Sequence, residues 1–149
     1  MGDKMFDKYL KFIIDKHSGQ LDKGGSPYFI HPIAVALKCS SESAKVVALF
    51  HDILEDTDAT INDLYLLGLE KEEIDAIQLL TKPEKEDYMH YIKRIAKNPI
   101  AKEVKKCDLL HNMDLSRLET ITERDVARKE KYQKAYNALS NSILYDGED

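Results

Sequence analysis

The chain has 149 residues, a net charge of −5, two cysteines, and 43% hydrophobic and 33% charged residues. The length predicts one domain over residues 1–149, with 145–149 as a frayed tail, and the short aliphatic runs exclude both wholesale disorder and a membrane-spanning helix of about 18 apolar residues. The acidic balance disfavours a binder of duplex nucleic acid, and two cysteines without metal-ligand spacing favour a reducing cytoplasm.

Helical periodicity dominates the first half of the chain. Apolar residues at positions 6, 9, 10, 13 and 14 predict an amphipathic helix that ends near Gly19, and 17–27 (HSGQLDKGGSP) has the composition of a loop. Pro32 suits the first turn of a second helix that runs through 33–37. A third helix is expected over 43–54, with Ser41 or Ser43 as its N-cap.

The same periodicity continues through the second half. Thr60 is the expected N-cap of a short helix that ends near Gly68, and a helix over 72–80 ends where Lys82 precedes Pro83, since the residue before proline disfavours helical geometry. Helices over 88–96, 100–113 and 123–144 complete the set, without a repeat or an interdomain linker. The sequence therefore predicts an all-α bundle.

The motif HDILED, at 51–56, is the most informative stretch. With about 100° per residue on one helix, His51, Asp52, Glu55 and Asp56 share one arc of about 140°. An ordinary amphipathic helix with a solvated acidic edge gives the same pattern. Here, however, the helix begins with AKVVALF, which is apolar on several sides and favours an arc that faces an internal cleft. Imidazole and carboxylate from one turn suit a divalent transition metal.

Two further stretches carry polar groups within apolar patterns. In CDLLHN, at 107–112, Asp108 and Asn112 lie on one helix face with Lys105 in the same arc. On local grounds, the favoured explanation of that pattern is a surface salt bridge from Asp108 to Lys105 or Lys106, with Asn112 at a helix end. In PYFIHP, at 27–32, His31 lies at a helix start, where a histidine can be a cap, a core residue or a ligand.

Taken in order, these stretches resemble the HD superfamily of metal-dependent phosphohydrolases, and more closely the RelA/SpoT-type alarmone hydrolase domain and the small alarmone hydrolases. HSGQLDKGGSPYFIHPIAVAL is similar to the first motif of that family, and FHDILEDT is similar to its HDxxEDT motif. LLTKP and VKKCDLLHNM are similar to its later threonine-lysine and K-x-A-D-R-x-H-N motifs. Four ordered motifs over more than ninety residues make this resemblance specific.

The resemblance implies a single-domain HD-type helical bundle with a central metal site. The metal, usually Mn2+ or else another divalent transition metal, would be held by His31, His51, Asp52 and Asp108. The residues that position and deprotonate the attacking water would be Glu55 and Asp56. The nucleotide and its phosphates would contact Lys23, Asn112 and Tyr132.

Elementary chemistry agrees with these implied roles. Two imidazoles and two carboxylates leave coordination positions open, as a catalytic metal requires, and the metal lowers the pKa of a bound water. Repulsion between the crowded acids should raise the pKa of at least one carboxyl group, which suits a general base.

The reaction implied by the resemblance is hydrolysis of the 3′-pyrophosphate of (p)ppGpp, the guanosine tetra- or pentaphosphate, which releases pyrophosphate and GDP or GTP. Larger family members carry a synthetase domain after this one. With 149 residues, only the hydrolase activity is expected here.

The sequence departs from the family pattern in the loop that contacts the base. It has Asp22-Lys23-Gly24-Gly25 where the family usually has Arg-Lys-Ser-Gly, so an acid replaces a stacking cation. Leu109 also stands where the family prefers arginine. A second interpretation is therefore an HD-type phosphohydrolase that acts on another nucleotide or phosphate ester, and a third is a catalytically silent module that binds an alarmone or a partner protein. The sequence predicts no oligomeric state.

Overall fold

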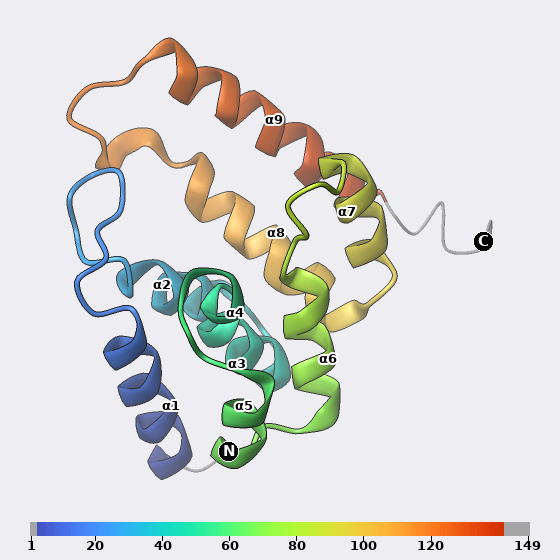
Figure 1. The fold of residues 1–149 in the computed structure, drawn as a ribbon. Coiled ribbons are helices and arrows are strands. Elements are labelled where there is room, and N and C mark those ends of the chain that lie inside the picture. The colour runs from blue at the N-terminus through green and yellow to red at the C-terminus, as the bar shows by residue number, and fades with distance from the viewer. Residues whose placement is uncertain (1–2, 142–149) are drawn as a thin grey trace.

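The computed structural model describes residues 3–141, and in that range helices and loops make up the chain, with no strand (Figure 1). The predicted all-α architecture is confirmed, and none of the described helices is long and apolar enough to cross a bilayer. The elements are α1 (Asp3–Lys16), α2 (Ile30–Lys38), α3 (Glu42–Phe50), α4 (Ile53–Asp56), α5 (Ile61–Leu67), α6 (Lys71–Leu80), α7 (Tyr88–Ala96), α8 (Pro99–Met113), the 3-10 turn η1 (Leu115–Arg117) and α9 (Glu123–Ser140).

Local capping explains where several helices begin and end. The Ser41 side chain accepts a hydrogen bond from the Ala44 amide and starts α3, and Thr60 forms a capping box with Asp63 at the start of α5. Gly68, with φ of 97°, ends α5 in the left-handed conformation that glycine adopts without steric cost. Thr60 was predicted as a cap, and Ser41 was one of the two serines, with Ser43, predicted to cap the third helix.

Most of the predicted ranges agree with the structure to within a few residues. α7 has the predicted bounds, and α6 and α8 each begin one residue earlier than predicted. α1 ends at Lys16 rather than near Gly19, and α9 ends at Ser140, four residues before the expected end. The expected frayed tail at 145–149 lies outside the described residues.

One predicted helix is wrong in a way that matters for the site. The range 43–54 is not continuous, because α3 ends at Phe50 and α4 begins at Ile53, with His51 and Asp52 between them. Asp52 has φ of −104° and ψ of 0°, outside regular helix geometry. The apolar pattern continues through Ile53 and Leu54, so periodicity could not reveal the break. The arc calculated for residues 51–56 on one helix therefore does not hold.

Helix α8 lies at the centre of the bundle. It packs against α2, α3, α6, α7 and α9, and Figure 1 shows it between α9 on one side and the N-terminal helices on the other. Its buried residues include Ala101, Val104 and Leu109, which belong to the apolar core. Because α8 is covered on several sides, its polar side chains face either a neighbouring helix or a cavity.

Candidate metal centre and active-site cleft

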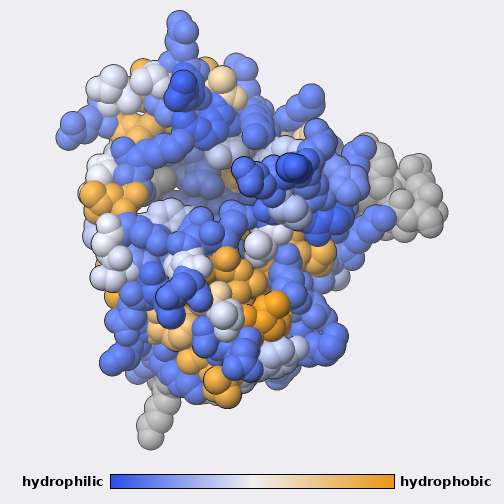
Figure 2. All heavy atoms as spheres, viewed as in Figure 1, coloured by the Kyte–Doolittle hydropathy of each residue, from blue (hydrophilic) through white to orange (hydrophobic). Residues whose placement is uncertain are grey.

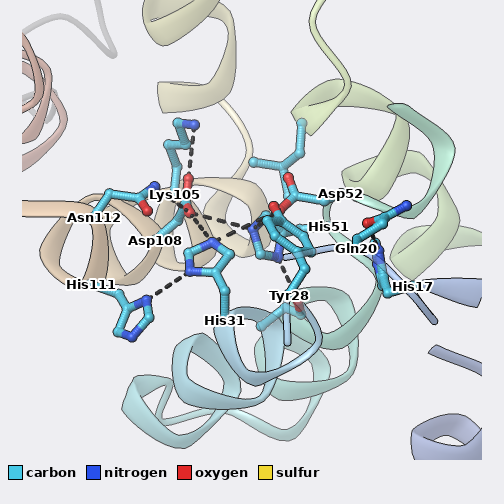
Figure 3. A network of polar contacts seen from close by, with 12 residues as sticks. His17, Gln20, Tyr28, His31, His51, Asp52, Lys105, Asp108, His111 and Asn112 are labelled. Atoms are coloured by element: carbon cyan, nitrogen blue, oxygen red, sulfur yellow. Dashed lines mark hydrogen bonds and ion pairs between the residues drawn. The ribbon is translucent and has the colours of Figure 1, made fainter. Parts of the chain in front are cut away.

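Three helices bring two imidazoles and one carboxylate together in the interior. His31 comes from the first turn of α2, His51 follows the last residue of α3, and Asp108 comes from α8; all three are buried. Their ligand atoms lie within 4.8 Å of one another, and His31 Nε2 is 2.8 Å and His51 Nε2 is 3.4 Å from Asp108 Oδ1 (Figure 3). Such a group can hold a divalent metal ion.

The hydrogen bonding of His51 fits a metal ligand. Its Nδ1–H donates to the Ala48 carbonyl oxygen at 2.6 Å, so in the neutral imidazole the Nε2 lone pair is available to a metal. Nε2 is buried and makes no hydrogen bond in the described structure, although it lies 3.1 Å from Asp52 Oδ2 and 3.4 Å from Asp108 Oδ1. A buried nitrogen that faces two carboxylates without a hydrogen bond is the arrangement that a shared cation would satisfy.

His31 is oriented by a second histidine. His31 Nδ1 lies 2.7 Å from Nδ1 of His111, while its Nε2 faces Asp108. If His31 Nδ1 carries the proton and donates to His111, the Nε2 lone pair is free for a metal. Figure 3 shows His111 on the side of His31 away from His51, where it supports the ligand without reaching the centre.

Asp108 is fixed by groups of its own helix. Lys105 Nζ donates to Asp108 Oδ2 at 2.9 Å and Asn112 Nδ2 donates to Oδ1 at 3.1 Å. The side chains of Lys105 and Asp108 are only 13% and 5% exposed. The salt bridge considered from the sequence is therefore present, but it is buried and does not lie on the surface. Burial alone would raise the pKa of Asp108, but the Lys105 ammonium and the contacts with His31 and His51 hold it well below its usual range.

Asp52 lies beside this group of three residues. Its Oδ2 atom is 3.1 Å from His51 Nε2 and 3.8 Å from His31 Nε2, and it accepts a short hydrogen bond from the Tyr28 hydroxyl. When the His51 imidazole is protonated, its positive charge outweighs burial and lowers the pKa of Asp52 to about 2. Tyr28 belongs to the PYFIHP motif, but sequence reasoning gave it no role.

Glu55 and Asp56 follow on the short helix α4, and each is anchored by a distant segment. Glu55 Oε1 accepts a hydrogen bond from the Lys82 amide at 2.7 Å, which gives the LLTKP motif a physical role. Gln20 Nε2 donates to the Asp56 carbonyl oxygen at 2.9 Å. Partial burial and the carboxylates of Asp52 and Glu55 raise the pKa of Asp56, as expected for crowded acids.

The three predicted substrate residues meet at one cavity of about 280 Å³, which His31 also lines. Its walls come from the 20–28 loop, from the end of α8 with η1, and from α9. Figure 2 shows the surface hollowed between α9 and this loop, with a mainly hydrophilic rim. The predicted residues on this wall are Lys23, Asn112 and Tyr132; sequence reasoning assigned α9 mainly to a solvated face and did not single out two further cations there, Arg128 and Lys129.

Asp22 also lines this cleft, and its side chain has a structural task. Its Oδ1 atom accepts hydrogen bonds from the amides of Gly24 and Ser26, both at 2.9 Å. Gly25 completes the turn with φ of +85°, which favours glycine. The carboxylate that replaces the family arginine therefore stabilises the loop.

Curated proteins with similar sequences agree with the resemblance seen in the motifs. No protein-family model matches the chain. A probable guanosine-3′,5′-bis(diphosphate) 3′-pyrophosphohydrolase of Synechocystis sp. is 34% identical over 136 residues, which cover 80% of this chain and 18% of that protein. The bifunctional (p)ppGpp synthase/hydrolase SpoT of Escherichia coli (strain K12) is 32% identical over 133 residues, which cover 77% of this chain and 18% of SpoT. This chain belongs to the RelA/SpoT-type hydrolase domain family, which confirms the predicted resemblance.

The fold of a RelA/SpoT-type hydrolase domain is also found in a solved structure. A metazoan ortholog of SpoT, described as hydrolysing ppGpp, matches with a TM-score of 0.78 and 24% sequence identity. The match covers 95% of this chain and 88% of that chain. By contrast, the chain spans 18% of the length of each of the two curated relatives, and so corresponds to one region of these larger proteins.

Proposed function

We propose that this chain is a Mn2+-dependent guanosine-3′,5′-bis(diphosphate) 3′-pyrophosphohydrolase. The observation that carries the proposal is the meeting of His31, His51 and Asp108 beside a cleft that Lys23 and Tyr132 also line. A buried group of two imidazoles and a carboxylate, one of whose members also lines a cleft that carries the cations Lys23, Arg128 and Lys129, fits hydrolysis of a phosphorylated substrate.

His31, His51 and Asp108 would hold the metal, with Asp52 as the fourth ligand. The mixed nitrogen and oxygen donors suit a divalent transition metal, and Mn2+ is the one that the family resemblance implies. When bound, such a cation lowers the pKa of a coordinated water and offsets negative charge at the attacked phosphorus. The cytoplasm is the proposed compartment, because a chain with only two cysteines suits a reducing environment.

Glu55 and Asp56 on α4 would orient the attacking water and accept its proton. Asp56, whose pKa is raised, can accept this proton near neutral pH more readily than an ordinary aspartate, and Glu55, held by the Lys82 amide, would orient the water. Water adds to phosphorus as the bond from phosphorus to the 3′ oxygen breaks. The products are pyrophosphate with GDP from ppGpp, or with GTP from pppGpp.

The cleft would hold the rest of the nucleotide. Lys23, Arg128 and Lys129 can bind phosphate oxygens, Asn112 can donate or accept hydrogen bonds, and the Tyr132 ring can contact the base or ribose. The same walls also carry Asp22, Asp114 and Asp125, and Arg128 Nη2 lies 3.1 Å from Asp125 Oδ1, so the three cations face three acids.

The direct test is release of pyrophosphate from ppGpp by the purified chain with Mn2+. The proposal expects turnover that stops on chelation and returns when Mn2+ is added back, because the metal and not the fold alone supplies the reactivity. Mn2+ binding with no turnover of ppGpp would contradict the proposed substrate.

A second candidate function is a phosphohydrolase of the same fold that acts on another nucleotide or phosphate ester. It is favoured by Asp22, which places a carboxylate on the cleft wall where a polyphosphate would lie. A panel of nucleoside mono-, di- and triphosphates measured beside ppGpp separates the two candidates by their kcat/KM values.

Asp22→Asn isolates the effect of this charge. Asparagine keeps an oxygen for the Gly24 and Ser26 amides, so the loop should stay folded while the negative charge is lost. We expect the KM for ppGpp to fall about fivefold with kcat unchanged, since one charge at close range is worth ~1 kcal/mol in water. The control is Asp22→Ala, which also removes the loop hydrogen bonds. An unchanged KM in the asparagine variant would show that the carboxylate does not oppose the substrate.

A further inference from the structure

The short helix α4, which carries Glu55 and Asp56, is too short to hold its own shape. It has four residues, about one turn, and a single turn does not form a stable helix by itself. The carbonyl oxygen of its last residue, Asp56, lies beyond the reach of an amide in the same helix. The position of the Asp56 carboxylate therefore depends on the contacts that other segments make with α4.

The loop between α1 and α2 contacts both ends of α4. At the start of the helix, the Tyr28 hydroxyl donates a short hydrogen bond to Asp52 Oδ2. At its end, Gln20 Nε2 donates to the Asp56 carbonyl oxygen at 2.9 Å. The Gln20 backbone is itself fixed, because its amide donates to the His17 carbonyl oxygen at 3.1 Å and its carbonyl oxygen accepts from the Tyr28 amide at 2.8 Å. The Gln20 side chain thus extends from a fixed backbone to the end of α4.

His17 orients the Gln20 amide from the other side. His17 Nδ1 lies 2.8 Å from Gln20 Oε1, and Figure 3 shows the imidazole next to the amide. The Asp56 carbonyl oxygen can only accept a hydrogen bond, so the Gln20 NH2 group faces it, and Gln20 Oε1 accepts the proton of His17 Nδ1. The three groups form one chain of hydrogen bonds from the end of α1 to the main chain of Asp56.

The His17 side chain is held in place by its burial. It is 1% exposed, and its amide donates to the Ile13 carbonyl oxygen of α1 at 3.0 Å. Its ring packs against Tyr28 with 5.1 Å between the ring centroids. Its Nε2 atom makes no hydrogen bond with the described residues, so its polar contact there is the one from Nδ1 to Gln20. A buried imidazole placed in this way is suited to fix the orientation of the Gln20 amide.

We propose that His17 and Gln20 are positioning residues for the hydrolysis, which together hold the Asp56 end of α4 and with it the carboxylate that accepts the proton of the attacking water. This inference rests on the proposed function, which assigns that proton to Asp56. Neither residue belongs to the group of metal-ligating atoms, so both act through the main chain of Asp56 and not through the metal. A misplacement of about 1 Å at a catalytic group can cost on the order of 100-fold in rate.

Gln20→Met tests the proposal, because methionine is unbranched and of similar length but has no amide. We expect kcat for ppGpp to fall at least about tenfold, while KM and the Mn2+ affinity stay within about twofold of the unmodified protein. The matched control is Gln133→Met on the exposed side of α9, where the lost amide contacts Asn137. All three quantities should stay within about twofold in this control. A raised KM with unchanged kcat in Gln20→Met would place Gln20 with the substrate and overturn the positioning role.

Two variants at His17 separate an action through Gln20 from a general effect on packing. His17→Asn keeps an N–H donor near the position of Nδ1 and should retain kcat within about threefold, whereas His17→Leu should lower kcat about as much as Gln20→Met. The double variant His17→Leu/Gln20→Met should be no slower than the slower single variant, because both substitutions break the same chain of hydrogen bonds. Effects that multiply in the double variant would show that His17 acts independently of Gln20 and would overturn the proposal.

Hydrogen exchange gives a readout that does not depend on the substrate. The amides of Asp56 and Thr57 close the turn of α4, and in the metal-free, 15N-labelled chain they should exchange about tenfold faster in Gln20→Met than in the unmodified protein and the α9 control. Unchanged exchange, or an unchanged kcat beside an active unmodified protein, would overturn this inference. Absence of ppGpp hydrolysis by the unmodified protein would contradict the proposed function instead, while faster exchange in Gln20→Met would still show that Gln20 supports α4.

Discussion

Asp108→Asn is expected to weaken Mn2+ binding by more than about 100-fold and to lower the rate of ppGpp hydrolysis at least about 1,000-fold. The Asp108 carboxylate is buried between His31 and His51. An amide in its place removes the negative charge that α8 presents to both imidazoles. It also leaves the Lys105 ammonium without its carboxylate. We expect a loss of unfolding free energy on the order of 3 kcal/mol, as for other buried ion pairs that lose one partner.

Metal titration, hydrolysis rates and thermal unfolding of this variant separate the metal effect from the stability effect. The matched control is Asp75→Asn, which removes a carboxylate from the surface pair with Lys71 on α6 and should leave all three measurements nearly unchanged. If Asp108→Asn does not fold, Asp52→Asn tests the same centre at a position with no lysine salt bridge in the described structure. Full Mn2+ affinity in a folded Asp108→Asn protein would contradict the assignment.

Asp56→Asn is expected to lower kcat about 100- to 1,000-fold while the protein still binds Mn2+. Asp56 lies on α4 and is outside the group of metal-ligating atoms, so its loss should remove the proton acceptor and spare the metal. Asp58→Asn is a close control, because Asp58 is exposed and paired with Lys16. Its kcat should stay within about twofold of the unmodified protein.

The pH dependence gives this prediction a second readout. Asp56 must be deprotonated to act as a base, and its pKa is raised above the ordinary value of 3.8. At saturating Mn2+, kcat should therefore rise with pH through this raised pKa and then level off. The residual rate of Asp56→Asn should lack that rise. A variant that keeps both the kcat and the pH profile of the unmodified protein would assign the proton to another group.

The fold was largely predictable because its signals are local. The 3.6-residue period located the helices, and Ser41, Thr60 and Gly68 act as caps through their own side chains or backbone. The break at His51 and Asp52 was not predictable. It is accompanied by a contact between Asp52 and Tyr28, 24 positions earlier, while the apolar pattern continues without interruption.

The site, like the fold, was predictable where its signals lie within sequence motifs and was not predictable where they depend on helix packing. The order of the four motifs resembles that of a known family, so His31, His51 and Asp108 could be singled out before their convergence was visible, although local patterns left His31 and Asp108 open. Helix packing alone decides that the pair of Lys105 and Asp108 is buried rather than exposed.

The central claim is that one cation binds between α2, the end of α3 and α8. An anomalous difference map from crystals grown with Mn2+ tests it most directly. The account predicts a single strong peak about 2.0–2.4 Å from His31 Nε2, His51 Nε2 and an Asp108 oxygen. No peak between these atoms, with Mn2+ saturating in solution, would contradict it.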